Sequence, residues 1–437
     1  MRKNVLRVLY GLFFVCTAAL FIACALLLVH TFGTGRESSL GAVKINVNEE
    51  TPSQYRRITE ISLSPPEGTE ETGEEYGYGS LADEAQRELY HLLSDAVMEI
   101  PEQPNDDGRY PTRRVRMEGM HLSEDGIRRA LNGFLYDHPQ VFWLENLFGY
   151  AYSGEDTLVE CYSAVSASRC ASCSQEMTEK IESYLRGVSR KESYYDKEKY
   201  IHDRLLSECR YNTSVTSNQD GWEYFSAYGA IVYGEAVCEG YSKAMQLLLT
   251  KAGFSCRTIR GTAGDVEHMW NLVKINGSWY QLDATWDDGE DAVSHEYFNL
   301  TTQAMQIDHQ IYPLLPAEGT MEKANLFLPE CRASAMNYYT VEGITVSSLG
   351  GDMDQYMIDY IVNRVKAGHE FLPLIISNRL AYQDTVERLF YQSPYKFYYY
   401  IDQANLLLPA ERQIQRDHLR ILRNEKTGTV RVRVSCG

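Results

Sequence analysis

This 437-residue chain contains the segment His268-Met-Trp-Asn-Leu-Val-Lys-Ile-Asn-Gly-Ser-Trp-Tyr-Gln-Leu-Asp283, from which its central architecture can be predicted. Its Asn276-Gly277 pair stands between two runs rich in aliphatic and aromatic residues, which is the strongest short-range signal for a β-hairpin with a type I′ turn. A two-residue loop places Asp283 opposite Trp270, two residues from His268. Because strand side chains alternate between faces, we expect the His268 imidazole and the Asp283 carboxylate on one face, within reach of each other.

The opposite face of the hairpin carries apolar side chains, namely Val273, Ile275, Tyr280 and Leu282. This pattern predicts one face buried in a core and one face that presents His268 and Asp283. Trp270 shares the face of His268, so we expect it at the substrate site, where it would help to exclude water. Packing is the commoner role of an aromatic residue in such a position.

A helix is predicted over residues 238–252, upstream of the hairpin. Its apolar positions recur every three or four residues and are Tyr241, Ala244, Met245, Leu248, Leu249 and Ala252. Gly253 is a good helix terminator, and Cys238 falls in the first turn. The partial positive charge of a helix N-terminus favours a thiolate there, although a cysteine taken alone is more often a buried core residue.

Taken together, Cys238, His268 and Asp283 predict a Cys–His–Asp triad. In such a site the thiolate attacks a carbonyl carbon, the imidazole transfers protons, and the carboxylate holds the imidazole in the productive tautomer.

Three sequence blocks resemble the transglutaminase-like superfamily, and its bacterial, membrane-anchored branch related to kyphoscoliosis-peptidase-type proteins is the most similar. The blocks are Ala236-Val-Cys-Glu-Gly-Tyr241, His268-Met-Trp-Asn-Leu272 and Leu282-Asp-Ala-Thr-Trp-Asp287, and Tyr297-Phe-Asn-Leu300 and Asp308-His309 resemble the end of that domain. The resemblance covers about residues 195–312. It implies an α+β, papain-like fold in which a nucleophile helix packs on an antiparallel sheet, with Cys238 as nucleophile, His268 as acid and base, and Asp283 as the orienting carboxylate.

The resemblance also implies an oxyanion hole, with the backbone N–H of Cys238 as one donor. We assign Tyr228 as the second donor. No cofactor and no metal ion are expected. The flanking sandwich domains of the large calcium-regulated animal enzymes are not found in the sequence, so calcium dependence is not expected either.

A membrane anchor is predicted near the N-terminus. Residues 8–32 contain no Asp, Glu, Lys or Arg, and about 20 apolar residues are enough to span a bilayer. Arg2, Lys3 and Arg7 precede this segment, which places the N-terminus inside and the bulk of the chain outside the cytoplasm. The alternative is a cleaved signal peptide, with which the bulk of the chain is also exported.

The exported part is acidic. Three of the 42 basic residues precede the apolar segment, which leaves 39 basic residues against 60 acidic ones. Such a charge disfavours nucleic acid as a partner. The eight cysteines beyond the apolar segment form no disulfide framework, and Cys170-Ala-Ser-Cys173 is incidental or a local disulfide rather than a metal or redox site, because a zinc site would need two more ligands.

Composition and periodicity predict five parts. They are a cytoplasmic tip and transmembrane anchor (1–32), an acidic, glycine-rich linker (33–80), a mainly helical N-terminal region (81–194), the transglutaminase-like catalytic domain (195–312) and a small C-terminal α/β unit (313–437). In the last part we expect helices at 353–367 and 382–391 and strands at 371–377, 397–401, 419–422 and 429–434. This unit shows no chemical constellation and is interpreted as a scaffold or protein-binding module.

The sequence therefore predicts a membrane-anchored, extracytoplasmic thiol enzyme that carries out acyl transfer or amide hydrolysis on proteins or peptides through a thioester. The alternative is a non-catalytic cell-envelope scaffold or binding protein that uses the same fold.

Overall fold

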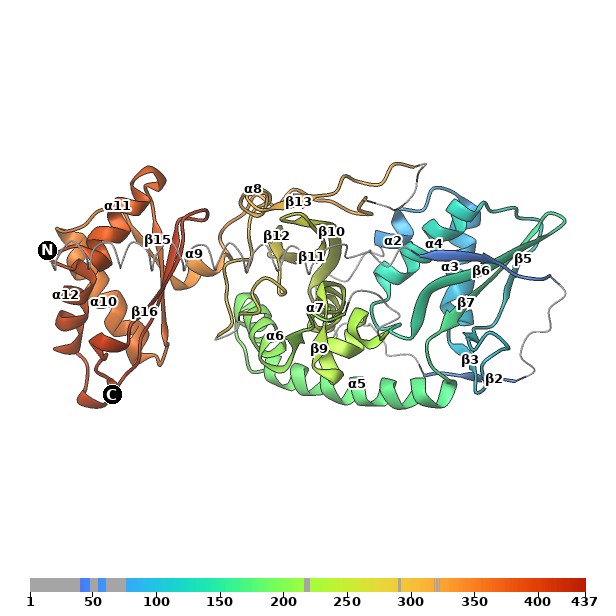
Figure 1. Cartoon of the computed structure of the whole chain (residues 1–437), viewed down its shortest axis with the longest axis horizontal. Helices are drawn as coiled ribbons and strands as arrows, with labels where there is room; N and C mark the ends of the chain where they lie inside the picture. Colours follow the sequence, from blue (N-terminus) through green and yellow to red (C-terminus); the bar gives the residue numbers. More distant parts are fainter. Residues whose placement is uncertain are drawn as a thin grey trace, which may run out of the picture.

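A four-stranded antiparallel sheet occupies the middle of the molecule, and helix α7 packs against it (Figure 1). The strand order is β12-β11-β10-β13, formed by Ser278–Leu282, Val266–Ile275, Ser255–Ala263 and His309–Ile311. α7 spans Cys238–Lys251. The mixed helical and strand content expected from the sequence is confirmed.

The computed structural model describes residues 40–47, 54–59, 76–215, 221–289, 292–317, 319, 321 and 323–437. Among the helices of these residues, none is both long enough and apolar enough to cross a bilayer. The apolar segment 8–32 lies outside the described residues.

The hairpin of β11 and β12 has the register expected from the sequence. Asn271 pairs with Leu282, and the turn residues Asn276 and Gly277 have φ values of 51° and 78°, as a type I′ turn requires. Asp283 follows β12 directly and therefore faces Trp270.

Both faces of this hairpin are buried. The side chains of Val273, Ile275, Tyr280 and Leu282 join the largest core of the molecule, together with the apolar face of α7. On the other face Trp270 and Leu272 lie in a smaller core, which the segment after β12 covers with Tyr297, Leu300, Met305 and Cys331. The face that carries His268 and Asp283 is thus a covered surface rather than an open one.

Polar contacts fix α7 on the sheet. The Ser242 hydroxyl donates to the backbone oxygen of Met269 at 2.8 Å, and the Asn271 amide donates to the backbone oxygen of Ser242 at 2.9 Å. Gly240 is required in the first turn, since a Cβ atom there would lie 2.7 Å from the backbone oxygen of Tyr224. These contacts hold Cys238 close to the strand that carries His268.

Two long helices, α5 (Ala167–Val188) and α6 (Tyr194–Glu208), lead into this body, and α5 also runs alongside the N-terminal part (Figure 1). Between α6 and α7 the chain forms β8 (Arg210–Tyr211), η2 (Glu223–Phe225), the π-helical η3 (Gly229–Tyr233) and β9 (Glu235–Ala236). β8 pairs in parallel with β9, with Tyr211 next to Ala236. After β12 the chain forms the short helix α8 (Thr302–Met305).

A second sheet forms the N-terminal part, in the order β1-β6-β7-β4, with β5 also paired to β7. Its strands are Gly41–Lys44, Leu144–Ser153, Asp156–Ser163, Tyr110–Pro111 and Val115–Met117. Helices α2 (Tyr76–Gly79), α3 (Glu84–Ala96) and α4 (Glu124–Asp137) pack together beside it, and β2 (Tyr55–Arg57) pairs with β3 (Glu99–Pro101). The region 81–194, expected to be mainly helical, thus also carries most strands of this sheet.

The expectation of a linker over residues 33–80 is wrong for its described parts. Residues 41–44 pair in parallel with residues 147–150, and residues 55–57 pair with residues 99–101. Buried Leu40 and Ile58 lie beside these two strands. A few apolar side chains and backbone hydrogen bonds are enough to add a short strand to a sheet, even within a polar segment.

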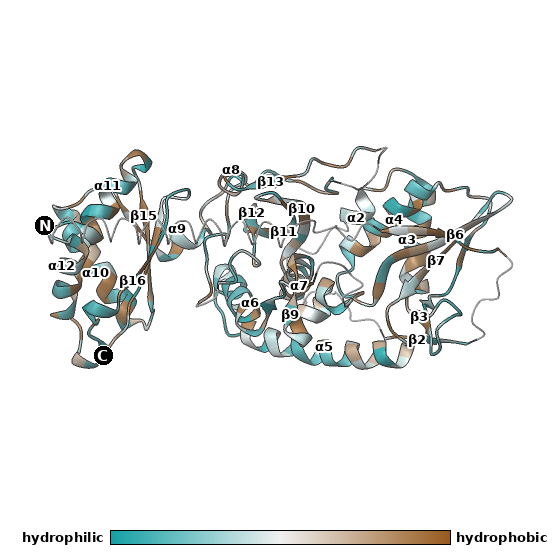
Figure 2. Ribbon diagram, in the orientation of Figure 1, coloured by the Kyte–Doolittle hydropathy of each residue, from teal (hydrophilic) through white to brown (hydrophobic). Residues whose placement is uncertain are grey.

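Residues 344–434 have a hydrophobic core of their own. Their sheet has the order β14-β15-β17-β16, formed by Ile344–Val346, Phe371–Ile376, Thr429–Arg433 and Arg420–Asn424, and β15 is mostly hydrophobic (Figure 2). The helices are α9 (Tyr338–Glu342), α10 (Asp352–Lys366), η4 (Arg379–Ala381), α11 (Tyr382–Val386), η5 (Glu387–Tyr391), α12 (Lys396–Asn405), η6 (Ala410–Arg412) and η7 (Arg416–His418).

Two expectations for the C-terminal unit are corrected. Residues 397–401 form part of α12 and not a strand, because Phe397, Tyr400, Ile401 and Ala404 follow a helical period and are fully buried. Residues 313–343 pack partly on the rest of the chain: Leu315 lies in a small cluster with Tyr136, and Tyr338 and Tyr339 join the largest core. The end of this segment also contacts the C-terminal unit, since Glu342 pairs with Arg364 of α10.

The C-terminal unit touches the segment that follows Asp283 in the chain. Glu296 accepts hydrogen bonds from the Thr429 hydroxyl at 2.8 Å and from the Asn424 amide at 3.2 Å, and its other oxygen accepts from the Tyr339 hydroxyl. The Arg431 guanidinium donates to the backbone oxygen of Val293 at 2.7 Å. Burial raises the pKa of Glu296, so its carboxylate depends on these donors.

We predict that Leu248→Ala in α7 lowers the free energy of unfolding by about 2–5 kcal/mol, because the side chain is fully buried in the largest core. Urea titration followed by tryptophan fluorescence measures this loss. Leu380→Ala is the matched control: Leu380 is fully exposed, and we expect a change within about 0.5 kcal/mol. Equal effects of the two substitutions would contradict the packing described here.

Candidate active site

The structure brings His268 and Asp283 into direct contact. Nε2 of His268 lies 2.7 Å from Oδ2 of Asp283, and the two side chains are 7% and 0% exposed. The other oxygen of Asp283, Oδ1, accepts the backbone N–H groups of Thr285 and Trp286 at 2.9 and 3.1 Å. The carboxylate is thus fixed from both sides, as an orienting group requires.

Cys238 lies at the first position of α7, where Val237 is the N-cap. The Cys238 side chain lies close enough to His268 to raise the pKa of the imidazole. Since Nε2 is occupied by Asp283, the Nδ1 atom is the ring nitrogen left for the sulfur. Cys238 is partly exposed, whereas Asp283 is sealed from solvent, so a substrate can approach the sulfur and not the carboxylate.

The charges of the site favour a protonated imidazole. Burial alone would lower the pKa of His268, but the negative charge of Asp283 and the hydrogen bond to it outweigh burial and raise the pKa to about 10. Burial would raise the pKa of Asp283, but the two histidines that contact it hold that pKa well below its usual range. At neutral pH the imidazole therefore carries a proton beside the Cys238 sulfur.

Tyr211 contacts Cys238 and was missed by the sequence analysis. The pairing of β8 with β9 places Tyr211 beside Ala236, and the Tyr211 hydroxyl accepts the backbone N–H of Cys238. Burial raises the pKa of Tyr211, and the nearby groups of Cys238 and Asp283 raise it further, so the phenol keeps its proton and remains a donor. The spacing of a tyrosine 27 residues before a cysteine carries no sequence signal for this contact.

Tyr228, assigned to the oxyanion hole from the sequence, lies elsewhere. Its hydroxyl donates to Oε2 of Glu176 in α5 at 2.8 Å, and its ring stacks with those of Phe142 and Trp222. The assignment of Tyr228 is therefore corrected: the π-helical turn that follows it directs the chain so that this hydroxyl pairs with α5 rather than with Cys238.

Trp270 stacks on the ring of His268, with ring centroids 5.8 Å apart. It is 1% exposed, and its indole N–H donates to Gln281, so it packs against the imidazole from the interior of the protein. The exposed aromatic side chain at the site is instead Trp286, which is 38% exposed and whose ring lies 6.3 Å from that of His268.

A second histidine, His309 at the start of β13, joins the site together with the preceding Asp308. Nε2 of His309 lies 3.0 Å from Oδ2 of Asp283, and Nδ1 of His309 lies 2.7 Å from Oδ1 of Asp308. In the sequence, Asp308-His309 resembles only the end of the domain. The contact of His309 with Asp283 depends on the pairing of β13 with β10, which is a long-range contact that no local sequence pattern predicts.

Two groups of side chains in the described residues have the types that could hold a metal ion: His268, Asp283 and His309, and also His202, Asp203 and His295. In each group two imidazole nitrogens lie 2.7–3.0 Å from a single carboxylate oxygen. These are hydrogen-bond distances, so the shared carboxylate oxygen of each group is already engaged by two imidazole rings.

The eight described cysteines are free thiols. Six are buried, including Cys170 and Cys173, which both lie within α5. Cys238 is partly exposed and Cys436 is exposed. Of these eight, Cys238 is thus the one that combines accessibility with a neighbouring imidazole.

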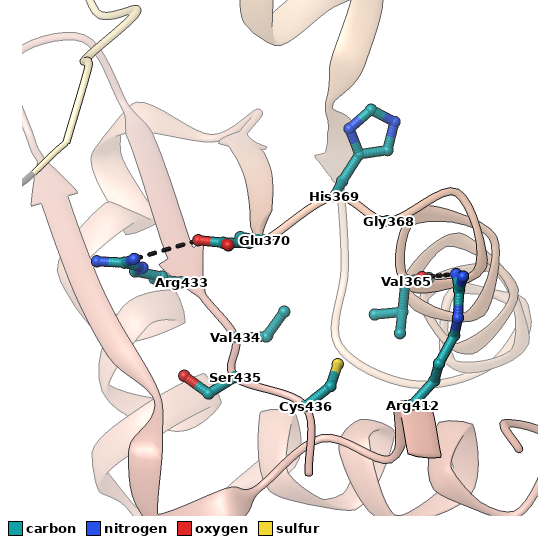
Figure 3. A pocket seen from close by; sticks show the side chains of 9 residues that line it. All are labelled: Val365, Gly368, His369, Glu370, Arg412, Arg433, Val434, Ser435 and Cys436. Carbon is teal, nitrogen blue, oxygen red and sulfur yellow. Dashed lines mark hydrogen bonds and ion pairs between the residues drawn. The ribbon is translucent and has the colours of Figure 1, made fainter. Parts of the chain in front are cut away.

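A pocket of about 410 Å³ lies in the C-terminal unit and contains Cys436 (Figure 3). Its charged side chains are already engaged: Arg433 pairs with Glu370 at 3.1 Å, and Arg412 donates to the backbone oxygen of Val365 at 3.1 Å. His369 also lines the pocket, and burial lowers its pKa. This pocket offers no nucleophile paired with a base.

Comparison with known proteins agrees with the geometry. Residues 182–284, about a quarter of the chain, match the transglutaminase-like superfamily, and this range includes Cys238, His268 and Asp283. Kyphoscoliosis peptidase of Homo sapiens is 28% identical over 91 residues, which are 16% of this chain and 14% of that protein. Kyphoscoliosis peptidase of Mus musculus is 30% identical over 64 residues, covering 12% of this chain and 10% of that protein.

The chain therefore spans about a seventh or less of the length of these two curated relatives. The crystal structure of a TGase is 13% identical to this chain with a TM-score of 0.25, and the match covers 43% of this chain and 53% of the TGase. The chain carries a transglutaminase-like domain at residues 182–284, and this superfamily contains cysteine-dependent enzymes.

We predict that Asp283→Asn lowers the pKa of His268 from about 10 to below its ordinary value of 6.5, because burial remains while the opposing charge is lost. The imidazole is then neutral at pH 7, and alkylation of Cys238 by iodoacetamide slows by about tenfold or more. The pH dependence of the alkylation rate measures this. Asp265→Asn, in the exposed turn between β10 and β11, is the control and leaves the rate unchanged.

Proposed function

We propose that this protein is a membrane-anchored, extracytoplasmic thiol enzyme that transfers or hydrolyses the acyl group of a protein or peptide amide. The observation that carries the proposal is the hydrogen bond of 2.7 Å between His268 and the buried Asp283, with the accessible Cys238 beside the same imidazole. The apolar segment 8–32 and the three cations before it support the location.

The first half-reaction forms a thioester. The Cys238 thiolate attacks the amide carbonyl carbon, so that a C–S bond forms and the carbonyl oxygen becomes an oxyanion. The His268 imidazolium gives its Nδ1 proton to the nitrogen of the leaving amine, and the C–N bond breaks. Asp283 keeps the ring in place and stabilises its positive charge before the transfer.

The second half-reaction releases the acyl group. Neutral His268 takes a proton from water or from an amine, which attacks the thioester carbon, and the C–S bond breaks to restore the thiolate and the imidazolium. Water gives hydrolysis and an amine gives cross-linking. Trp286, exposed beside His268, supports a role in limiting water at this step.

Tyr211 completes the oxyanion hole in this proposal. Its hydroxyl now accepts the Cys238 N–H, so a substrate oxygen that enters between them would receive both the backbone N–H and the phenolic O–H. Preorganised donors of this kind lower the barrier of acyl transfer by a few kcal/mol.

The C-terminal unit is proposed to bind a protein partner. Its exposed surface includes Leu380, Leu406 and Leu407, all more than half exposed, which is compatible with a docking surface. The non-catalytic scaffold remains the competing function, and the alkylation experiment that follows separates the two.

We predict that iodoacetamide at pH 6 labels Cys238 of the full chain faster than its other cysteines. An ordinary thiol with a pKa of about 8.5 is less than about 1% ionised at that pH, whereas the accessible sulfur of Cys238 lies beside the protonated imidazole of His268, an environment typical of reactive cysteines. Peptide mass spectrometry of the labelled chain identifies the site. Cys238→Ala removes the fast phase and His268→Ala slows it, while Cys436→Ala, which deletes the exposed thiol, leaves it unchanged.

Uniformly slow labelling, or faster labelling of Cys436 than of Cys238, would favour the scaffold over the enzyme. With an active preparation, a labelled primary amine offered together with candidate proteins distinguishes the two outcomes of the thioester. Incorporation without cleavage indicates a transferase, and cleavage without incorporation indicates a hydrolase.

We predict that Tyr211→Phe lowers kcat for an amide substrate by about 10²–10³ and leaves KM nearly unchanged, because the lost donor acts on the transition state. Alkylation of Cys238 by iodoacetamide forms no oxyanion, so its rate stays close to that of the wild type. Tyr228→Phe, whose hydroxyl pairs with Glu176, is the matched control and retains kcat. A Tyr211→Phe variant with full kcat would rule out this donor.

A further inference from the structure

His309 reaches the catalytic carboxylate across the width of the sheet. In β10, Gly261 pairs with His268 of β11 on one side and with Ile311 of β13 on the other. His309 lies two residues from Ile311, so its side chain is on the same face as that of His268. Gly261 carries no side chain between them: a Cβ atom there would lie 2.6 Å from the Trp270 ring. The rings of His268 and His309 thus approach to 5.7 Å between centroids.

All four oxygens of the two carboxyl groups beside His309 have a polar partner within hydrogen-bond distance. Oδ1 of Asp283 accepts two backbone N–H groups, and Oδ2 faces Nε2 of both histidines. Oδ2 of Asp308 accepts the Tyr297 hydroxyl at 2.8 Å, and Oδ1 faces Nδ1 of His309 at 2.7 Å. These contacts hold the pKa of both carboxyl groups below the usual range against the effect of burial, so both groups are carboxylates at neutral pH.

Both ring nitrogens of His309 therefore face carboxylate oxygens. A nitrogen without hydrogen would point a lone pair at a negative oxygen, which is repulsive at 2.7 or 3.0 Å. Each nitrogen must carry a hydrogen, which makes the ring a cation. The side chain is fully buried, and a buried cation is stable only when it is paired in this way.

We propose that His309 is a permanent imidazolium, held between Asp283 and Asp308, which positions the Asp283 carboxylate and offsets part of its charge at His268. This inference rests on the proposed function for its catalytic meaning. The titratable and charged groups that face His309 are Asp283, Asp308, His268 and Tyr297, and Lys426 acts on Asp308 from the C-terminal unit. The direction of the pKa shift of His309 agrees with this proposal. Burial would lower the pKa, but the bonds of His309 to the two carboxylates raise it.

The positive charge of His309 determines how strongly Asp283 attracts the proton of His268. The negative charge of Asp283 stabilises the protonated form of His268. A second positive ring on the same oxygen of Asp283 weakens this stabilisation. Without His309 the full negative charge of Asp283 would act on His268, which would then hold its proton more tightly. A general acid that releases its proton less readily protonates the leaving amine less effectively. His309 is a positioning residue in this reading, since it touches Asp283 and not the substrate.

The test is a pH titration of the full chain with ¹⁵N-labelled histidine, followed by NMR, in a Cys238→Ala background that removes the influence of the sulfur on His268. We expect His309 to show two protonated ring nitrogens from pH 6 to pH 9. In His309→Gln, which keeps an N–H donor without the charge, the midpoint of His268 rises by about one pH unit. In Asp308→Asn, which removes the need for the second proton on His309, it moves in the same direction.

Gln310→Ala is the control, because Gln310 is exposed on the same strand, and the midpoint of His268 stays in place. A neutral His309 ring at pH 7 in the parent chain overturns the proposal, as does an unchanged or lowered midpoint in Asp308→Asn. If His309→Gln does not fold, the parent chain and Asp308→Asn still decide the question. The NMR readout needs no substrate, so a failure of the proposed catalytic function is distinguished from a failure of this inference.

Discussion

The type I′ turn at Asn276 and Gly277 is the constraint on which the active site depends. It fixes the pairing of β11 with β12, and the pairing alone determines which residue faces Trp270 at the end of the hairpin. A slip of one residue would turn Asp283 to the opposite face, among the aliphatic side chains of the main core. The bond between His268 and Asp283 is therefore as much a product of turn chemistry as of attraction between the two groups. The positive φ angles at both turn positions explain why asparagine and glycine stand there.

The parts of the site that local rules govern could be predicted from the sequence. The hairpin register, the start of α7 at Cys238 and the shared face of His268 and Asp283 follow from turn chemistry and from side-chain periods within about 50 residues. His309 and Tyr211 could not be found in this way. Their contacts depend on the pairing of β13 with β10 and of β8 with β9, and two- or three-residue strands carry almost no periodicity.

The wrong expectations have physical reasons as well. The run from Phe397 to Ile401 is rich in residues that favour strands, yet its fully buried positions follow a helical period, and burial outweighs propensity. Tyr228 was assigned to the oxyanion hole, but its hydroxyl donates to Glu176 of a distant helix. Trp270 was placed on the correct face, and that face proved to be covered. In each case the deciding partner comes from a segment that the local pattern does not contain.

Glu296 links two parts of the molecule that have separate hydrophobic cores. The transglutaminase-like domain and the C-terminal unit have independent hydrophobic cores, which suggests that one could be exchanged without the other. Three donors to Glu296 come from residues 424–429, and the Tyr339 hydroxyl donates to its other oxygen. Excision of the C-terminal unit would remove these three donors from an acid on the segment that follows Asp283. The two units therefore depend on each other through Glu296, although each has its own hydrophobic core.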